Sequence, residues 1–235
     1  MKQQSITIYL YKTHSGNEYP VEFGFKDINA EDISHDHEYI TGLCRQGCKN
    51  YNHSGGCPPF APTFESIAKE YNSAILVFAR LHSKYKTRRV KDSNNYYIHY
   101  RFQDIILSNF LNKMGQKIRK LFAPRVYFLG NGYCTGCGNR KCAFKEGMRK
   151  CRFPRKRTFS LEATGVNVEK TLKNVFGIKL EWYNRNNFRQ VSYLTKAIGF
   201  FCCSPVIRDK VHTHLNQGFL HNPRIPMITA FSPPL

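Results

Sequence analysis

The pattern of apolar and polar positions predicts several strands along the chain. Residues 5–12 alternate and are rich in β-branched and aromatic side chains, which is typical of a strand. Residues 74–81 form a continuous apolar run, which is typical of a strand buried on both faces. Residues 125–129 give another short strand, and further candidates lie at 178–183 and 191–201.

Between residues 81 and 125 the apolar positions change to three- and four-residue steps, which predict a long amphipathic helix over residues 95–122. Pro124 is expected to end this helix. A strand, a long helix and a strand form a βαβ unit, for which parallel pairing of the two strands is expected. We therefore predict an α/β fold with a mixed sheet, a βαβ unit and cysteine-rich metal-binding loops. The apolar face of the helix consists of Leu107, Leu111, Met114, Ile118 and Leu121.

Three shorter helices are predicted from periodicity and capping residues. The first covers residues 32–43. The second covers residues 64–71, where the Thr63 hydroxyl can accept a hydrogen bond from the first turn. The third covers residues 167–176 and is expected to end at Gly177.

The chain changes character after residue 203. Apolar periodicity fades and prolines punctuate the segment, so we expect an extended arm that is packed on the domain or partly mobile. The predicted organisation is a single α/β metal-binding domain over residues 1–203 and a proline-containing C-terminal arm over residues 204–235. The prolines of this arm are Pro205, Pro223, Pro226, Pro233 and Pro234.

Seven of the nine cysteines fall into two groups with the spacing of metal ligands. A thiolate is a soft donor that favours zinc, copper(I) or iron–sulfur clusters, so this grouping predicts a metalloprotein. The first cysteine group is Cys44, Cys48 and Cys57. The second cysteine group is Cys134, Cys137, Cys142 and Cys151.

The second group has one C-x2-C pair followed by wider and unequal gaps. Zinc ribbons usually combine two such pairs, whereas a four-iron cubane accepts ligands from irregular spacings. We therefore favour a 4Fe–4S cluster at the second group, with zinc as the alternative.

The first group provides three thiols, and its fourth ligand is open. Cys202, Cys203, His53 or a carboxylate could supply it from elsewhere. Alternatively, a cubane held by three cysteines would leave one position for a substrate, or zinc could complete a Cys3His set with His53. We favour a cluster whose fourth position is open or is not a cysteine, which gives one or two 4Fe–4S clusters in all; no catalytic residue is assigned.

Other candidate motifs give weaker evidence for a metal or cofactor site. Cys202 and Cys203 are expected at a buried strand end, because free cysteine packs well inside proteins. The pairs at residues 35 and 37 and at residues 212 and 214 place two histidines each in polar surroundings, which does not favour a metal site. The glycines before Cys134 do not complete a dinucleotide-binding motif, because the third glycine is replaced by Thr135.

The chain is strongly basic, with 36 Lys and Arg against 16 Asp and Glu and a net charge of +20. Much of this charge lies in two runs, at residues 80–91 and 140–157, and aromatic residues such as Tyr85, Phe144 and Phe153 stand among the basic ones. Phosphate charge and base stacking are what single-stranded nucleic-acid binding uses, so a polyanion such as RNA is a predicted partner. A solvated, solubilising surface is the alternative.

The sequence predicts a cytoplasmic protein with no membrane partner. No stretch approaches the roughly 18 apolar residues of a membrane span, and the first residues lack the apolar block of a signal peptide. Disulfides are rare in a reducing compartment, so the cysteines are expected to be ligands or free thiols.

The two cysteine signatures, in this order, resemble a widespread prokaryotic family of predicted metal-binding proteins of unknown function. The resemblance covers roughly residues 40–200 and implies a metal or iron–sulfur centre in an α/β domain, but no particular reaction. Leu161 replaces a methionine of the family pattern. The matching pieces are Cys44, Cys48 and Cys57-Pro58-Pro59-Phe60-Ala61-Pro62, then Cys134, Cys137, Cys142 and Cys151-Arg152-Phe153-Pro154, then Ser160-Leu161-Glu162-Ala163-Thr164-Gly165.

Three functional hypotheses follow. The leading one is an iron–sulfur protein, and potentially an enzyme, whose first group is reactive in redox or sulfur-transfer chemistry on a polyanion such as tRNA. The second is a zinc-stabilised, non-catalytic nucleic-acid-binding module. The third is an electron carrier whose basic surface docks to an acidic redox partner protein.

Overall fold

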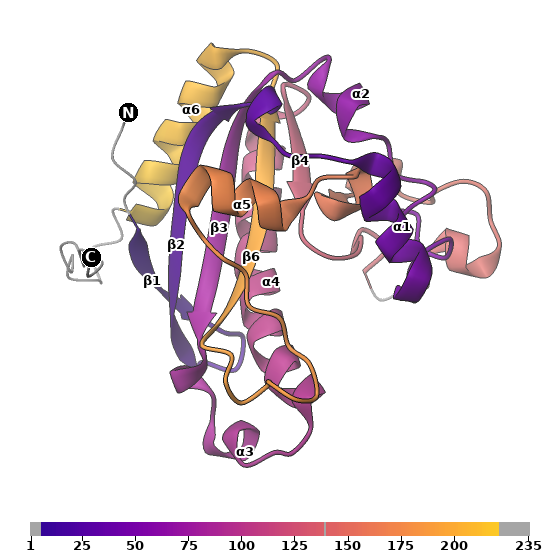
Figure 1. Ribbon diagram of the computed structural model, residues 1–235. Coiled ribbons are helices and arrows are strands. Elements are labelled where there is room, and N and C mark those ends of the chain that lie inside the picture. The colour runs from indigo at the N-terminus through magenta and orange to yellow at the C-terminus, as the bar shows by residue number, and fades with distance from the viewer. Residues whose placement is uncertain (1–5, 139, 221–235) are drawn as a thin grey trace.

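A six-stranded mixed sheet forms the centre of the computed structural model, which describes residues 6–138 and 140–220. Its strand order is β1-β2-β3-β6-β4-β5, and neighbouring strands are antiparallel except for β4 and β5, which pair in parallel. The mixed sheet and its helices confirm the predicted α/β class (Figure 1). The strands are β1 (Thr7–Lys12), β2 (Glu18–Asn29), β3 (Ser73–His82), β4 (Val126–Gly130), β5 (Phe159–Ser160) and β6 (Tyr193–Cys202).

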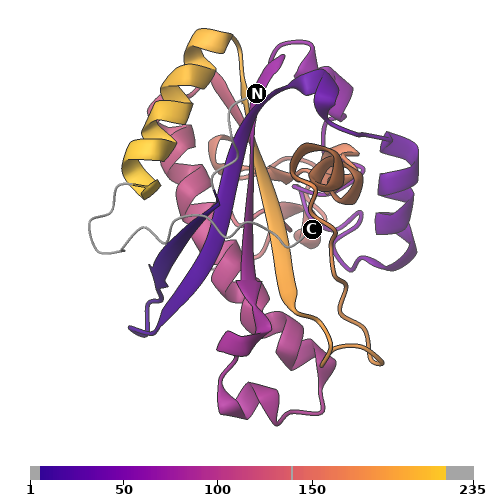
Figure 2. The same ribbon diagram turned by 60° about the vertical axis from the view of Figure 1, so that its left-hand side comes forward.

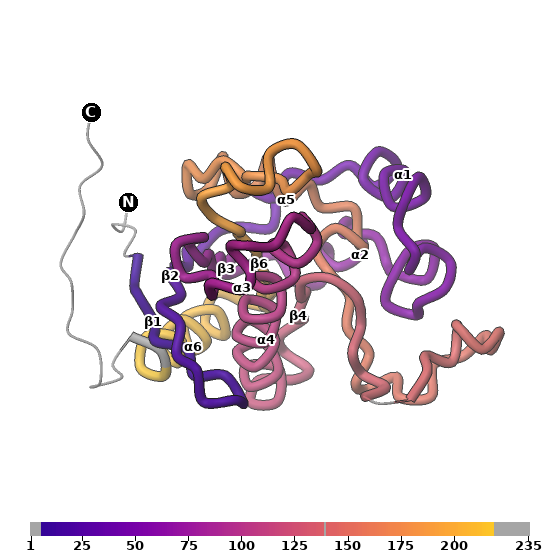
Figure 3. The backbone as a smooth tube through the Cα atoms, turned by 90° about the horizontal axis from the view of Figure 1, so that it is seen from below, coloured from indigo at the N-terminus to yellow at the C-terminus, as the bar shows by residue number. Residues whose placement is uncertain are grey.

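Helices cover both faces of the sheet. Helices α4 and α6 lie on one face and α5 lies on the other, while α1 and α2 lie toward the edge that carries β4 (Figures 2 and 3). None of the helices in the described part of the chain has the length and apolar character needed to cross a membrane. The helices are α1 (His37–Gly47), α2 (Phe64–Ala68), α3 (Arg88–Lys91), α4 (Tyr96–Phe122), α5 (Val168–Phe176) and α6 (Pro205–Leu215), with short 3-10 segments such as η3 (Ala143–Glu146), η4 (Pro154–Lys156) and η5 (Glu162–Thr164).

Strand β3 is buried on both faces, as its apolar run predicted. Successive side chains of a strand point to opposite faces, so Ile75 and Val77 enter the core beneath α4 and α6. Leu76 and Phe78 enter the second core, beneath α5. The sheet therefore separates two hydrophobic cores.

The expected parallel pairing of β3 and β4 is wrong. Both strands are antiparallel to β6, so they run in the same direction, but β6 lies between them. The βαβ unit formed with α4 is thus split by a strand from residues 193–202. Because β6 is apolar on both faces, it fits a central position, but its local sequence does not say which strands it pairs with.

The long helix α4 is confirmed, with Asn95 as its N-cap and Ala123 as its C-cap. Four of its five predicted apolar positions are buried, whereas Leu121 is 52% exposed and the neighbouring Phe122 packs against the core in its place. The predicted caps Thr63 and Gly177 are also confirmed, for α2 and α5. Helix α1 begins later than expected, at His37, and continues past the predicted end to Gly47.

Two predictions about irregular segments are wrong. Residues 178–183 form no strand, although Ile178 and Leu180 still pack their side chains into the core beneath α5. The segment after residue 203 begins with helix α6 instead of an extended arm, and its buried residues Ile207 and Val211 join the core beneath α4. Pro205 occupies the first turn of this helix, where its missing N–H costs nothing. The four later prolines lie outside the described residues.

Candidate metal centre

The two cysteine groups lie together beyond the β4 edge of the sheet. Strand β4 ends at Gly130, so the second group begins near the carboxyl end of this strand. Figure 1 shows α1, which carries the start of the first group, beside the loops that follow β4. Gly55 of the first loop and Cys142 of the second are 87 residues apart in sequence, yet their backbone and thiol are in hydrogen-bond contact.

The first group is built on the end of helix α1 and the turn after it. Cys48 is the C-cap of the helix, and its N–H donates to the carbonyl of Cys44 at 3.0 Å. Residues four apart lie on the same side of a helix, so these two thiols are neighbours. Cys57 closes a turn through its N–H, which donates to Ser54 O at 2.9 Å. Cys57 is buried, whereas Cys48 is exposed.

The second group occupies a loop of short turns. Cys142 is the N-cap of η3, and its thiol is hydrogen-bonded to that of Cys137. The thiol of Cys134 accepts hydrogen bonds from the N–H groups of Gly136, at 3.4 Å, and Thr158, at 3.3 Å. All four cysteines of this group are partly exposed.

Two glycines allow the loops of the two groups to touch. The Gly55 N–H donates to the Cys142 thiol at 3.4 Å. A Cβ atom on Gly56 would lie 2.5 Å from the Cβ of Cys134 and 2.5 Å from the carbonyl oxygen of Thr158. Only a residue without a side chain fits there, so Gly56 sets the closest approach of the two loops.

Arg157 fastens the two loops to each other. Its Nε donates to Gly55 O at 2.6 Å and its Nη2 donates to Phe60 O at 2.6 Å. The same guanidinium lies over the rings of Phe144, at 5.3 Å, and Phe159, at 4.8 Å. A charged donor shared by two backbone carbonyls is a strong contact, and it fixes the first loop against the second.

Thiols from both groups affect the pKa of Cys57. Burial raises the pKa of Cys57 to about 11; a hydrogen bond with Ser54 opposes this, and the nearby thiols of Cys48, Cys44 and Cys134 add to it. Cys134 belongs to the second group by sequence, yet its thiol contributes to the raised pKa of Cys57 in the first group. The structure therefore brings these two predicted ligands together.

The pKa of Cys142 is shifted in the opposite direction, below its ordinary value. Burial by itself raises its pKa, but the N–H groups of Gly55, Phe144 and Lys145 donate to its thiol and lower the pKa below the ordinary value. Backbone donors thus favour the thiolate form of Cys142, and the thiolate is the form that binds metals.

The donor set fits a soft metal. All nine cysteines are free thiols. Within residues 6–138 and 140–220, no three His, Cys, Asp or Glu side chains are already arranged around one point as metal ligands. The chemistry of the site, which is thiols with N–H donors aimed at their sulfur atoms, suits zinc or an iron–sulfur cluster.

Cys202 and Cys203 are not placed to complete the first group. Cys202 pairs with Val126 at the start of β4, whereas the second group follows Gly130 at the other end of that strand. Cys202 is fully buried in the core beneath α4, and Cys203 is exposed. His53 lies in the first loop but is exposed, while Cys57 is buried.

The histidine pairs have other partners. His35 pairs with Glu65 at 3.2 Å, and the Nδ1 of His37 contacts the carbonyl of Thr164 at 3.4 Å. His212 is bound to Asp27 at 2.7 Å on the far side of the sheet. These contacts give structural roles to His35, His37 and His212, whereas His214 packs its ring against Phe122 and its buried Nε2 has no hydrogen-bond partner among the described residues.

Glu162 does not cap the helix that follows it. Asn167 is the N-cap of α5, and its side chain accepts a hydrogen bond from Lys170 N–H at 2.9 Å. Glu162 begins η5, and its carboxylate is one of the groups that raise the pKa of Cys44, after burial and Cys48. It is therefore a carboxylate near the first group.

The two basic runs differ in their surroundings. In the run at 80–91, Arg80 pairs with Glu22 at 2.7 Å, and Lys86 is 6% exposed, so part of this charge is structural. In the run at 140–157 the described basic residues are exposed except for Arg157, and the sole acid, Glu146, pairs with Arg152. The second cysteine group is thus surrounded by exposed positive charge.

Sequence reasoning missed the residues that join the two groups. The sequence identifies Arg157 only as part of a basic run, and nothing in it distinguishes Thr158. The adjacent glycines before Cys57 were the available signal, because glycine often marks a close approach of two backbones.

A family model described as predicted metal-binding protein (DUF2284) matches residues 26–197 of the chain. This range contains both cysteine groups, the contact between them, the whole of β3, β4 and β5, and parts of β2 and β6. No curated protein and no solved structure matches the chain.

Proposed function

Because the chain belongs to the family of predicted metal-binding proteins (DUF2284), we propose that its grouped cysteines hold iron–sulfur clusters of the 4Fe–4S type. Metal binding follows from the family, and the identity of the metal is the proposal. The second group supplies four thiols, and the first group supplies three.

The contact between the two cysteine loops carries this proposal. Gly55 N–H points at the Cys142 sulfur, and two further N–H groups, from Gly136 and Thr158, point at the Cys134 sulfur. Hydrogen bonds to sulfur are among the means by which proteins tune iron–sulfur clusters. Zinc-bound thiolates accept the same donors, so the loop contact supports a thiolate metal centre, and the wide, unequal cysteine spacing of the second group favours an iron–sulfur cluster over zinc.

The first group is the proposed reactive centre. Its own loop supplies three thiols and no fourth cysteine. Two side chains from other segments lie near these thiols: Cys134 contributes to the raised pKa of Cys57, and Glu162 contributes to the raised pKa of Cys44. Cys48 is exposed, so this side of the group is accessible from solvent. A bound cluster would supply redox or sulfur-transfer chemistry, and the protein would supply access and charge.

The proposed substrate is RNA, such as tRNA, or another polyanion. The exposed basic residues around the second group support this, because clustered positive charge attracts phosphates and speeds their capture. Cationic side chains also lie over aromatic rings there, including Lys156 and Arg140 over Phe153.

The experiment that tests the metal is a measurement of iron, sulfide and zinc content with an absorption spectrum, on protein purified without oxygen. Two cubanes predict roughly eight irons and eight sulfides per chain, and one cubane predicts roughly four of each. Stoichiometric zinc without visible absorption would contradict the proposal and leave the zinc-stabilised binding module.

Cysteine variants test the site itself. Cys57→Ala should lower the iron content of the first centre, and Cys142→Ala should lower that of the second. Cys203→Ala is the matched control, because Cys203 is a free thiol away from both groups, and it should leave the iron content unchanged. Equal iron loss in all three variants would contradict the assigned ligands.

A further inference from the structure

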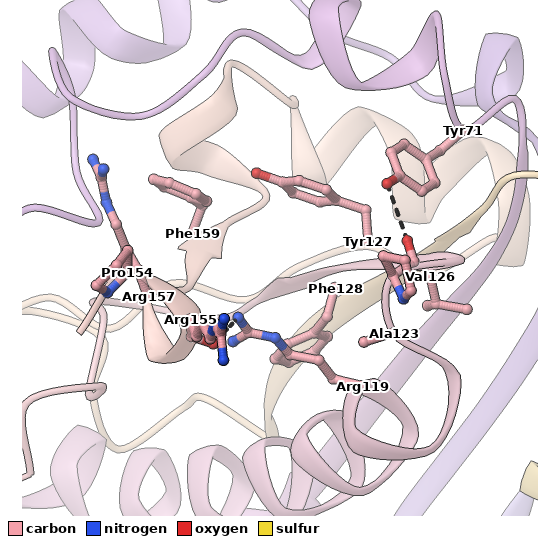
Figure 4. Close-up of a pocket in the computed structure, with 11 residues that line it drawn as sticks. Tyr71, Arg119, Ala123, Val126, Tyr127, Phe128, Pro154, Arg155, Arg157 and Phe159 are labelled. Carbon is pink, nitrogen blue, oxygen red and sulfur yellow. Dashed lines mark hydrogen bonds between the residues drawn. The ribbon is translucent and has the colours of Figure 1, made fainter. Parts of the chain in front are cut away.

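A groove of about 920 Å³ lies beside the cysteine loops, between the end of α4, strand β4 and residues 154–159. We call it the arginine groove. Figure 4 shows the rings of Phe159, Tyr127 and Tyr71 in a row, with Arg119 and Arg155 beside them. Its volume is in the range of sites that bind small molecules.

The groove is positively charged. Arg119, Arg155 and Arg157 line it, and its lining residues in the described chain include no Asp or Glu. Arg157 is engaged in fastening the cysteine loops, and Arg119 donates through Nη2 to Arg155 O at 2.5 Å. Arg155 is exposed, and its guanidinium makes no hydrogen bond or ion pair with the residues that the structure describes. This arginine is therefore available to an anion.

The other wall of the groove is aromatic. The rings of Tyr71 and Tyr127 are 5.6 Å apart at 56°, and the Tyr71 hydroxyl is fixed by donating to Pro124 O at 3.1 Å. The Tyr127 hydroxyl has no hydrogen-bond partner among the described residues. Burial raises the pKa of Tyr127, with Arg157 and Arg119 opposing it, so the hydroxyl stays protonated and can donate.

We propose that the arginine groove binds a nucleotide, with its phosphate at Arg119 and Arg155 and its base against the rings of Tyr127 and Phe159. Guanidinium groups bind phosphate with several hydrogen bonds, and aromatic rings stack on bases of any sequence. An inorganic anion would use the arginines alone, whereas a nucleotide uses both walls. The nucleotide can be free or part of a single strand, since both present the same chemistry.

The groove shares a wall with the proposed metal centre. Phe159 and Arg157 line the groove, while Thr158 between them donates its N–H to the Cys134 sulfur at 3.3 Å. A nucleotide in the groove would therefore lie next to the cysteine loops. This position relative to a cluster rests on the proposed function, whereas the binding itself rests on the groove alone.

The test is fluorescence anisotropy of the full chain with a labelled single-stranded RNA 12-mer, together with competition by AMP and by inorganic phosphate. Arg155→Glu should weaken RNA binding about tenfold or more, because it places a carboxylate at the phosphate position. Tyr127→Leu, which keeps an apolar side chain in the wall, should weaken binding about fivefold to tenfold through lost stacking. The control Arg89→Ala, on α3 at the far end of the molecule, should change binding less than twofold.

The outcomes separate clearly. Competition by AMP identifies a free-nucleotide site, whereas binding of the 12-mer without AMP competition identifies a single-strand site. Either result supports the inference, provided that Arg155→Glu and Tyr127→Leu weaken the binding. Equal weakening by Arg155→Glu and Arg89→Ala, or no effect of Tyr127→Leu in a protein with unchanged melting temperature, would overturn it. The iron content of the same samples reports on the proposed function separately, so each proposal can fail without the other.

Discussion

The guanidinium of Arg157 donates a 2.6 Å hydrogen bond to the carbonyl of Gly55, and this contact joins two loops that are far apart in sequence. Gly55 in turn donates its N–H to the thiol of Cys142. Both the carbonyl and the N–H of Gly55 in the first loop are thus hydrogen-bonded to side chains from the segment that carries the second group. The arrangement of the two cysteine groups therefore depends on these few contacts.

Replacing Arg157 by leucine should destabilise the protein and reduce its metal content. The substitution leaves the carbonyls of Gly55 and Phe60 without their charged donor, and a lost hydrogen bond of this kind costs on the order of 2 kcal/mol. Urea unfolding and metal analysis would measure both effects. Arg155→Leu is the matched control, because Arg155 is exposed, and unchanged stability in Arg157→Leu would contradict the fastening role.

Replacing Gly56 by alanine should separate the two cysteine loops. The new Cβ would meet the Cβ of Cys134 and a backbone oxygen at 2.5 Å each, and neither can move without moving its loop. We expect a loss of about 1–3 kcal/mol, typical of overpacking, and weaker metal retention. Gly42→Ala in helix α1 is the control: its Cβ would meet nothing within 4 Å, so a gain of about 0.5–1 kcal/mol is expected. Metal retention equal in the two variants would argue against loop contact at Gly56.

Replacing Gly115 by alanine should destabilise the sheet–helix contact behind the arginine groove. A Cβ there would lie 2.1 Å from the ring of Phe128, which is stacked on Phe200 with centroids 5.6 Å apart. Overpacking of about 1–3 kcal/mol should exceed the roughly 1 kcal/mol that alanine adds to helix stability. Gln116→Ala, at an exposed position of the same helix, should be nearly neutral in thermal unfolding. A melting temperature above that of the wild type for Gly115→Ala would show that α4 can shift freely.

Asp104 should stabilise the protein in a pH-dependent way. Burial by itself raises the pKa of Asp104, but Lys196 and Arg101, each 2.5 Å away, together lower it below the ordinary value. Because the pKa is lower in the folded than in the unfolded chain, the stabilisation is complete above the unfolded pKa of about 4 and is lost as pH falls through the folded pKa.

The substitution Asp104→Asn should therefore cost about 3 kcal/mol at pH 7, because it leaves the largely buried cation of Lys196 and the partly exposed Arg101 without their anion. The cost should shrink at pH 3, which lies below the unfolded pKa, because the unfolded chain is protonated there and the charge-dependent part of the stabilisation is decreasing. Urea unfolding at both pH values measures this difference. An equal cost at pH 3 and pH 7 would mean that shape, not charge, makes Asp104 important.

Much of the candidate site could be predicted from spacing, because ligands from one loop are encoded locally. Both cysteine groups, and the position of the second after β4, follow from the order of residues in the chain. The contact of Gly56 with Cys134 could not be predicted, because it depends on how two separate loops pack. The arginine groove could not be predicted from the sequence either, because Arg119, Tyr127 and Arg155 come from three different elements.

The sequence by itself determined the elements whose signals are local. The three- and four-residue period of α4, the caps Thr63 and Gly177, and the unbroken apolar run of β3 each act within a few residues, so each could be recognised without the fold. The tertiary structure alone decided that β6 separates β3 from β4 and that α6 follows it onto the core. Hydrophobic burial is non-directional, so an apolar strand specifies that it is covered but leaves the choice of its neighbours to the packing of the whole chain.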